Sequence, residues 1–121
     1  MQHQPRFLTL IEAIRPTIDE IAAADLAALL TAATHFTLLD VREREEYNTG
    51  HLPHAIHLSK GVLERDIESI VPNPDTPIIV YCSGGFRSIL AAHNLHAMGY
   101  QNVRALALGS RHWQTLGLPW L

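Results

Sequence analysis

The 121-residue chain contains one cysteine, so it can form neither an internal disulfide nor a zinc site built on several cysteines. Nine basic and twelve acidic side chains give a formal net charge of −3 without a cluster of one sign, which argues against a nucleic-acid-binding surface. No apolar run approaches the roughly 18 residues that a membrane-spanning helix needs, and residues 1–7 show no secretory leader. We therefore expect a cytoplasmic protein that has neither nucleic acid nor membrane among its partners.

Apolar runs and helical patterns alternate along the chain. The runs at 36–41 and 77–81 are continuous rather than alternating, which predicts strands covered on both faces. A short strand is expected at 17–21 and the last strand at 103–106, and a weaker strand candidate lies at 55–58. Helical patterns lie at 7–15, 25–30, 62–70, 89–98 and 112–116. This alternation predicts an α/β fold in which helices flank a mostly parallel central sheet.

The cysteine, Cys82, directly follows the run at 77–81, where α/β proteins commonly bind ligands. Gly84 and Gly85 allow the backbone to turn its N–H groups inward as an anion-binding nest, and the positive end of the next helix points into the same space. Arg87 adds a positive charge. Thiols in such surroundings ionise readily, so the sequence predicts a nucleophilic thiolate at Cys82 rather than an inert core cysteine.

Four motifs occur in order along the chain. They are Asp-Val-Arg-Glu at 40–43 with Glu-Tyr at 46–47, Gly-His-Leu-Pro at 50–53, Cys-x-x-Gly-x-Arg-Ser at 82–88, and Gly-Tyr at 99–100 followed by Trp113 and Gly-Leu-Pro at 117–119. Together they resemble a single-domain rhodanese, a sulfurtransferase. The resemblance implies the rhodanese fold over residues 18–121 and leaves residues 1–17 as an N-terminal helical extension.

The resemblance also implies a function. Cys82 would take a sulfane sulfur from a donor such as thiosulfate, hold it as a persulfide, and pass it to cyanide or a thiol. The residues implied to bind the sulfur are Ser83, Gly84, Gly85, Phe86, Arg87 and Ser88. The implied partners are a small-molecule donor, a small-molecule acceptor and also a protein acceptor, with no cofactor and no metal. A monomer and a homodimer both stay open.

Two alternatives compete with this interpretation. One is a phosphatase or arsenate reductase of the same fold, but such relatives carry a loop one residue longer than the six residues from Cys82 to Arg87. The other is a non-catalytic persulfide carrier or a redox-sensing module. The intact loop, with its glycines and Arg87, favours the enzyme.

The sequence departs from the family pattern at two turns. His54 stands where the family usually has glycine after Leu-Pro, and Leu108-Gly109 stands where it usually has Gly-Gly before the tryptophan. Both lie outside the loop 82–88, so we expect them to change local turn geometry and not the nucleophile.

Asp40 and Arg42 lie near the expected site, at the end of the run at 36–41 and directly after it. One interpretation makes Arg42 a cation that binds substrate. The other makes Asp40 an acceptor that anchors the loop and Arg42 a partner of Glu46, and we favour it because structural ion pairs are common near such sites.

Histidines recur every three residues at 51, 54 and 57. Pro53 prevents a helix there, and a strand would not place all three on one face. The sequence therefore predicts no metal site.

Overall fold

The computed structural model describes residues 3–32 and 34–121, and within them five strands form one parallel sheet in the order β1-β5-β4-β2-β3. The strands are β1 (Asp19–Ile21), β2 (Thr37–Asp40), β3 (Ile56–His57), β4 (Ile78–Tyr81) and β5 (Val103–Leu106). The helices are α1 (Pro5–Ile14), α2 (Ala23–Thr31), α3 (Arg44–Asn48), α4 (Leu63–Ile70), α5 (Arg87–Ala97) and α6 (Gly109–Thr115), with 3-10 turns η1 (Arg15–Thr17) and η2 (Lys60–Val62).

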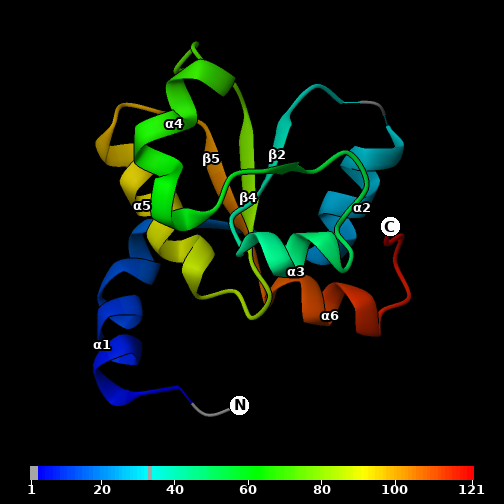
Figure 1. Cartoon of the computed structure of the whole chain (residues 1–121), viewed down its shortest axis with the longest axis horizontal. Helices are drawn as coiled ribbons and strands as arrows, with labels where there is room; N and C mark the ends of the chain where they lie inside the picture. The colour runs from blue at the N-terminus through cyan, green and yellow to red at the C-terminus, as the bar shows by residue number, and fades with distance from the viewer. Residues whose placement is uncertain (1–2, 33) are drawn as a thin grey trace.

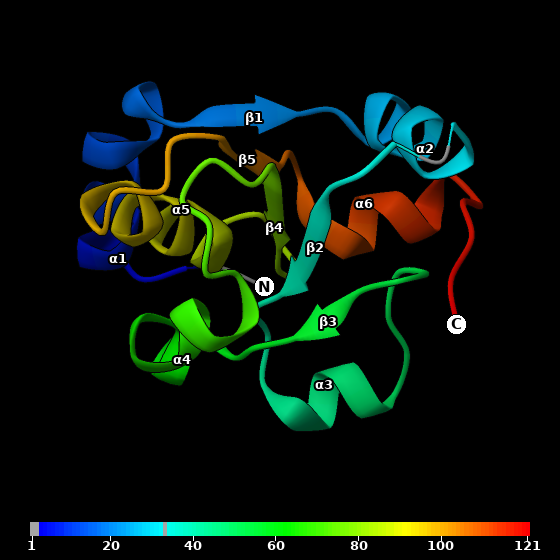
Figure 2. The ribbon, with the colours of Figure 1, turned by 90° about the horizontal axis from the view of Figure 1, so that it is seen from above.

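The helices cover both faces of the sheet. Helices α1, α4 and α5 pack on one face, helices α2 and α6 pack on the other, and α3 lies beside β3 at one edge (Figures 1 and 2). The predicted α/β fold with a parallel sheet flanked by helices is thereby confirmed. No helix in the described part of the chain is long and apolar enough to cross a membrane.

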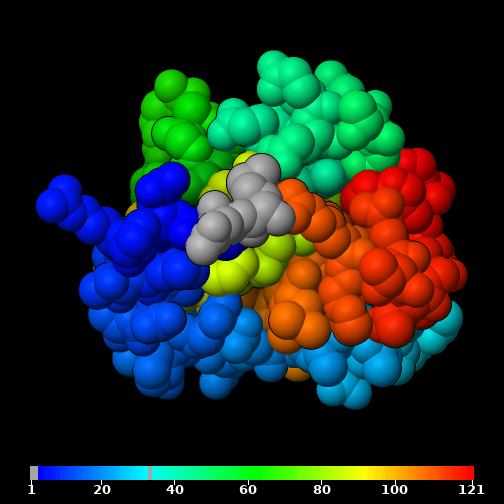
Figure 3. Space-filling view, turned by 90° about the horizontal axis from the view of Figure 1, so that it is seen from below, coloured from blue at the N-terminus to red at the C-terminus, as the bar shows by residue number. Residues whose placement is uncertain are grey.

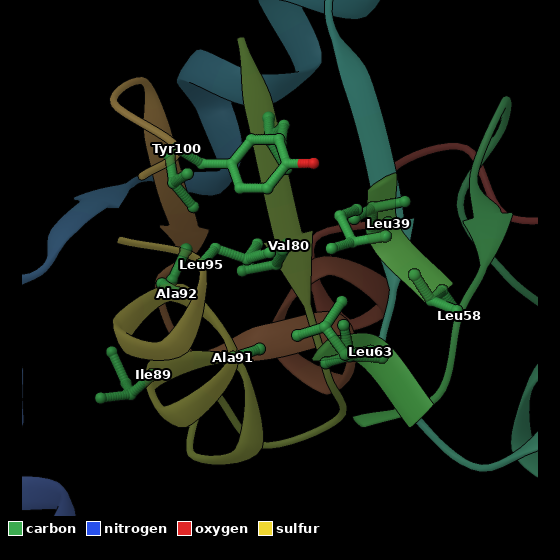
Figure 4. Packing of buried hydrophobic residues seen from close by; sticks show 14 of the residues in the cluster. Leu39, Leu58, Leu63, Val80, Ile89, Ala91, Ala92, Leu95 and Tyr100 are labelled. Atoms are coloured by element: carbon green, nitrogen blue, oxygen red, sulfur yellow. The ribbon is translucent and has the colours of Figure 1, made fainter. Parts of the chain in front are cut away.

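Strand β4 is central to the core because its side chains alternate between the two faces. Ile78 and Val80 point toward α4 and α5, and Ile79 and Tyr81 point toward α2 and α6. All four are buried, which is why the run carries no polar residue. Figure 4 shows Val80 packed between α5 and the neighbouring strand β2.

The N-terminal helix α1 packs against α5. The helical pattern at 7–15 has a narrow buried face, because Ile11 is buried in the core whereas Leu10 is 49% exposed. The boundary between an N-terminal extension and the domain, at residues 17 and 18, stays a prediction.

Both departures from the family pattern lie in left-handed backbone. His54 has φ of 67° and Leu108 has φ of 66°, a region that favours glycine because a Cβ is crowded there. The two turns therefore keep the geometry that glycine would give, at a cost in local strain.

Candidate active site

Cys82 lies at the carboxyl end of β4 and its sulfur is enclosed by the following loop. The backbone N–H of Gly85 donates to Sγ at 3.2 Å, the N–H of Ser88 donates at 3.4 Å, and Ser88 Oγ lies 3.5 Å away. The residue is only 1% exposed, but it lines a cavity of about 440 Å³. Amide donors aimed at one sulfur stabilise negative charge on it, so the loop suits a thiolate or a persulfide.

The start of helix α6 holds this loop in place. The N–H of Ser110 donates to the Cys82 carbonyl at 2.8 Å, and the N–H of Arg111 donates to the Ser83 carbonyl at 3.1 Å. Gly109 makes the close approach possible, since a Cβ there would lie 2.3 Å from the Ser83 carbonyl oxygen. The loop thus depends on a glycine that lies far from it in the sequence.

Gly109→Ala tests this close approach. Gly109 has φ of 71°, and its Cβ would press on the backbone of the loop, so we expect a loss of about 2 to 3 kcal/mol in the free energy of unfolding. Gly117→Ala is the matched control, because Gly117 has the same φ and open space around it. The control substitution should cost only about 1 kcal/mol. Equal effects of the two substitutions, measured by urea unfolding, would show that the contact with the loop is unimportant.

Arg87 is fixed at the wall of the cavity by Glu46 of α3. Its Nη1 and Nη2 donate to the two Glu46 carboxylate oxygens at 2.8 and 3.0 Å, and Nη2 also donates to Ser83 Oγ at 3.0 Å. The hydrogen bonds from Arg87 lower the pKa of Glu46 to about 2, and the same pair raises the pKa of Arg87. Glu46 also accepts from the Glu43 N–H at 2.9 Å, in the capping box of α3. The short helix therefore serves to position Arg87.

The Glu46 pair predicts a specific pH dependence. Because the pKa of Glu46 falls from 4.5 to about 2 on folding, its contribution to stability is present above pH 4.5 and is lost as the pH falls through about 2. The free energy of unfolding of wild type should therefore exceed that of Glu46→Gln above pH 4.5, and the difference should shrink as the pH falls toward 2. A difference that does not change over this range would show that the pair does not lower the pKa of Glu46.

Arg42 does not pair with Glu46, and that prediction is wrong. Its guanidinium donates to both Asp40 carboxylate oxygens, with Nη2 2.6 Å from Oδ2, and to the Gly50 carbonyl at 2.7 Å. Tyr81 Oη donates to the same carboxylate at 2.7 Å. Burial is the largest single influence and opposes the charge on Arg42, but the hydrogen bonds to Asp40 and the attraction of nearby negative groups together raise the pKa of Arg42. Arg42 is 5% exposed and does not line the cavity at Cys82, so the geometry favours a structural role over substrate binding.

The three histidines at 51, 54 and 57 do not converge. His51 stacks on Tyr47 at 4.2 Å, His57 lies 5.0 Å from the same ring, and His54 is exposed on its left-handed turn. Across residues 3–32 and 34–121 no group of three or more histidine, cysteine or acidic side chains could hold a metal ion.

The chain matches the rhodanese-like domain over residues 22–116. It belongs to that family. Thiosulfate sulfurtransferase GlpE of Coxiella burnetii is 31% identical over 77 residues, which are 64% of this chain and 70% of GlpE. YrkF of Bacillus subtilis, which is named for a proposed role as a sulfur carrier, is 30% identical over 97 residues. Those residues are 80% of this chain but 51% of YrkF, so the chain spans about half the length of that relative.

A solved structure has a similar fold over nearly all of the chain. The Rhodopseudomonas palustris protein RPA3614, of unknown function and described as a possible tyrosine phosphatase, superposes with a TM-score of 0.84 at 28% identity. The superposition covers 98% of this chain and 97% of that one. The superposition therefore also covers α1, which lies outside the matched residues 22–116.

Sequence reasoning missed several residues that line the cavity of this rhodanese-like domain. They are His3, Phe7, Glu46 and Arg111, which join the predicted residues Cys82, Ser83, Gly84, Phe86 and Arg87. Gly85 and Ser88 donate to the sulfur but do not line the cavity. The pattern Glu43-x-x-Glu46 was a usable signal, since it is the spacing of a capping box. Nothing in the local sequence signals that residues 3 and 7 lie over the loop.

Proposed function

We propose that this rhodanese-like domain is a sulfurtransferase that carries a sulfane sulfur on Cys82. The Cys82 thiolate attacks the outer sulfur of a donor such as thiosulfate, the S–S bond of the donor breaks, and sulfite leaves with the electron pair. An acceptor, either cyanide or a thiol, then attacks the outer sulfur of the persulfide and the Cys82 thiolate is restored. The residues that hold the sulfur belong to the loop 83–88.

The observation that carries this proposal is the pair of N–H groups directed at Sγ. Gly85 and Ser88 donate to the sulfur of a residue that lines the cavity, so charge on a thiolate would be stabilised before and after each transfer. In the proposed step a thiolate attacks as an anion, so the step itself needs no general base.

The phosphatase alternative is disfavoured by the size of the loop and by the position of Arg87. A phosphoryl group has three outer oxygens that each need a donor, whereas the Arg87 guanidinium is already occupied by Glu46 and Ser83. The description of RPA3614 as a possible tyrosine phosphatase makes a direct test worthwhile.

Loop length is predicted to select the reaction. The native protein should transfer sulfur and should hydrolyse aryl phosphates at a negligible rate. Insertion of one glycine between Gly85 and Phe86 should widen the loop, move the Gly85 N–H away from Sγ and reduce sulfur transfer by about tenfold or more. Slow phosphate hydrolysis by the insertion variant would agree with this account, whereas native phosphate hydrolysis faster than sulfur transfer would establish the phosphatase.

The likeness to YrkF supports the carrier alternative. Measurement of multiple turnover distinguishes a carrier from a sulfurtransferase. With thiosulfate and cyanide both in excess, a sulfurtransferase forms many equivalents of thiocyanate per chain. A carrier that depends on another protein for loading forms none under these conditions.

A further inference from the structure

The N-terminal helix forms one wall of the cavity at Cys82. The His3 ring lies 4.3 Å from the Phe86 ring, and the Phe7 ring lies 6.1 Å from it, so three rings from two distant segments meet at the cavity. In the view from below, the blue N-terminal helix flanks the yellow-green loop on one side and the orange start of α6 flanks it on the other (Figure 3). Residues 3 and 7 lie outside residues 22–116, so the match to the rhodanese-like domain does not account for this wall.

The other flank supplies a cation. Arg111 of α6 lines the same cavity, and within the described part of the chain no carboxylate lies within 4.0 Å of its guanidinium. Arg87, by contrast, is committed to Glu46. Among the described residues, Arg111 is therefore a guanidinium at this cavity that can bind an anion without giving up a carboxylate partner.

The cavity is larger than the simplest substrates need. Its volume of about 440 Å³ lies in the range that holds organic ligands. Cyanide has no apolar part to pack on aromatic rings and no acidic group for Arg111. The combination of an aromatic wall and an opposing guanidinium is complementary to a molecule that is apolar in its body and anionic at one end.

We infer that the acceptor of this site is an organic thiol that packs an aromatic or similarly apolar body on Phe7 and Phe86 and places an acidic group at Arg111. This inference rests on the proposed sulfurtransferase function. In the transfer step the acceptor thiolate attacks the outer sulfur of the Cys82 persulfide. A new S–S bond forms on the acceptor, the S–S bond to Cys82 breaks, and Cys82 leaves as a thiolate with the electron pair, so no oxidant or reductant is consumed.

The test isolates the second half of the reaction. The protein is loaded with thiosulfate, freed of donor, mixed with an acceptor, and followed by the loss of one sulfur from its intact mass. The acceptors are 4-(mercaptomethyl)benzoate, which has both features, benzyl mercaptan, which lacks the acid, mercaptoacetate, which lacks the ring, and cyanide. Each rate constant is compared with the others in the same protein, so a general effect on the nucleophile cancels.

In wild type, 4-(mercaptomethyl)benzoate should react faster than either thiol that has one feature. Phe7→Ala should lower the rate with 4-(mercaptomethyl)benzoate by about tenfold relative to the rate with mercaptoacetate. Arg111→Gln should lower the rate with 4-(mercaptomethyl)benzoate by about fivefold relative to the rate with benzyl mercaptan. The controls are Leu10→Ala, an exposed residue of the same helix, and Arg6→Gln, which removes a charge without lining the cavity. Both controls should keep the wild-type ratios.

Two results would overturn the inference and leave the proposed function intact. The first is efficient transfer to cyanide without any preference for the thiol that has both features. The second is a Phe7→Ala protein that is slowed equally with all four acceptors, because α1 would then only support the loop. Failure of wild type to gain sulfur from thiosulfate or from an organic persulfide would instead contradict the proposed function itself.

Discussion

Cys82→Ser is expected to lose sulfur transfer completely while its free energy of unfolding changes by about 1 kcal/mol or less. A serine hydroxyl is not ionised near neutral pH, so the N–H groups of Gly85 and Ser88 would face a neutral oxygen in place of a thiolate. The measurement is thiocyanate formation from thiosulfate and cyanide, with urea unfolding as the control for the fold. Transfer that survives in Cys82→Ser would contradict a persulfide intermediate, since the chain has no second cysteine.

Arg42→Leu is expected to lose about 3 to 5 kcal/mol of stability, because it leaves the Asp40 carboxylate buried without its charged partner. That is a large part of the roughly 5 to 15 kcal/mol that stabilises a typical domain. The loss should show as a lower urea midpoint, and Asp40→Asn combined with Arg42→Leu should recover part of it, because the unpaired charge is then removed.

The matched control is Arg65→Leu, which breaks the exposed pair of Arg65 with Asp66 and should leave the midpoint close to that of wild type. Arg42→Leu protein that is still folded should transfer sulfur, since Arg42 does not line the cavity. A stable Arg42→Leu protein without activity would instead support the interpretation of Arg42 as a cation that binds substrate.

The sheet could be predicted from the sequence because its strands are buried on both faces. The run at 77–81 is continuous and rich in β-branched residues, and it forms β4 at Ile78–Tyr81. The candidates at 17–21 and 55–58 also form strands, though shorter ones, at Asp19–Ile21 and Ile56–His57. Their ends were uncertain because edge strands are set by pairing with a neighbour more than by their own residues.

The predictions for the helices failed where local sequence carries little information. Helix α3, at Arg44–Asn48, was not predicted because it has five residues, few of them apolar, and a glutamate in place of a common N-cap residue. Helix α6 was predicted to begin at His112 but begins at Gly109, after a left-handed leucine that no propensity favours.

The loop of the candidate site could be predicted, but its surroundings could not. Gly85 and Ser88 are close to Cys82 in sequence, so the approach of their N–H groups follows from a tight loop before a helix. The partner of Arg87 is 41 residues away, and the choice between Arg42 and Arg87 as the partner of Glu46 is made by where α3 packs. The covering of the loop by α1 likewise depends on tertiary packing alone.

The central claim is that Cys82 holds the transferred sulfur, and intact-protein mass tests it most directly. After incubation with thiosulfate and removal of the donor, wild type is predicted to gain the mass of one sulfur and to lose it again on addition of cyanide. Cys82→Ser is predicted to gain no mass. A wild-type mass that stays unchanged after incubation with thiosulfate and with an organic persulfide, or an equal gain in Cys82→Ser, would contradict the account.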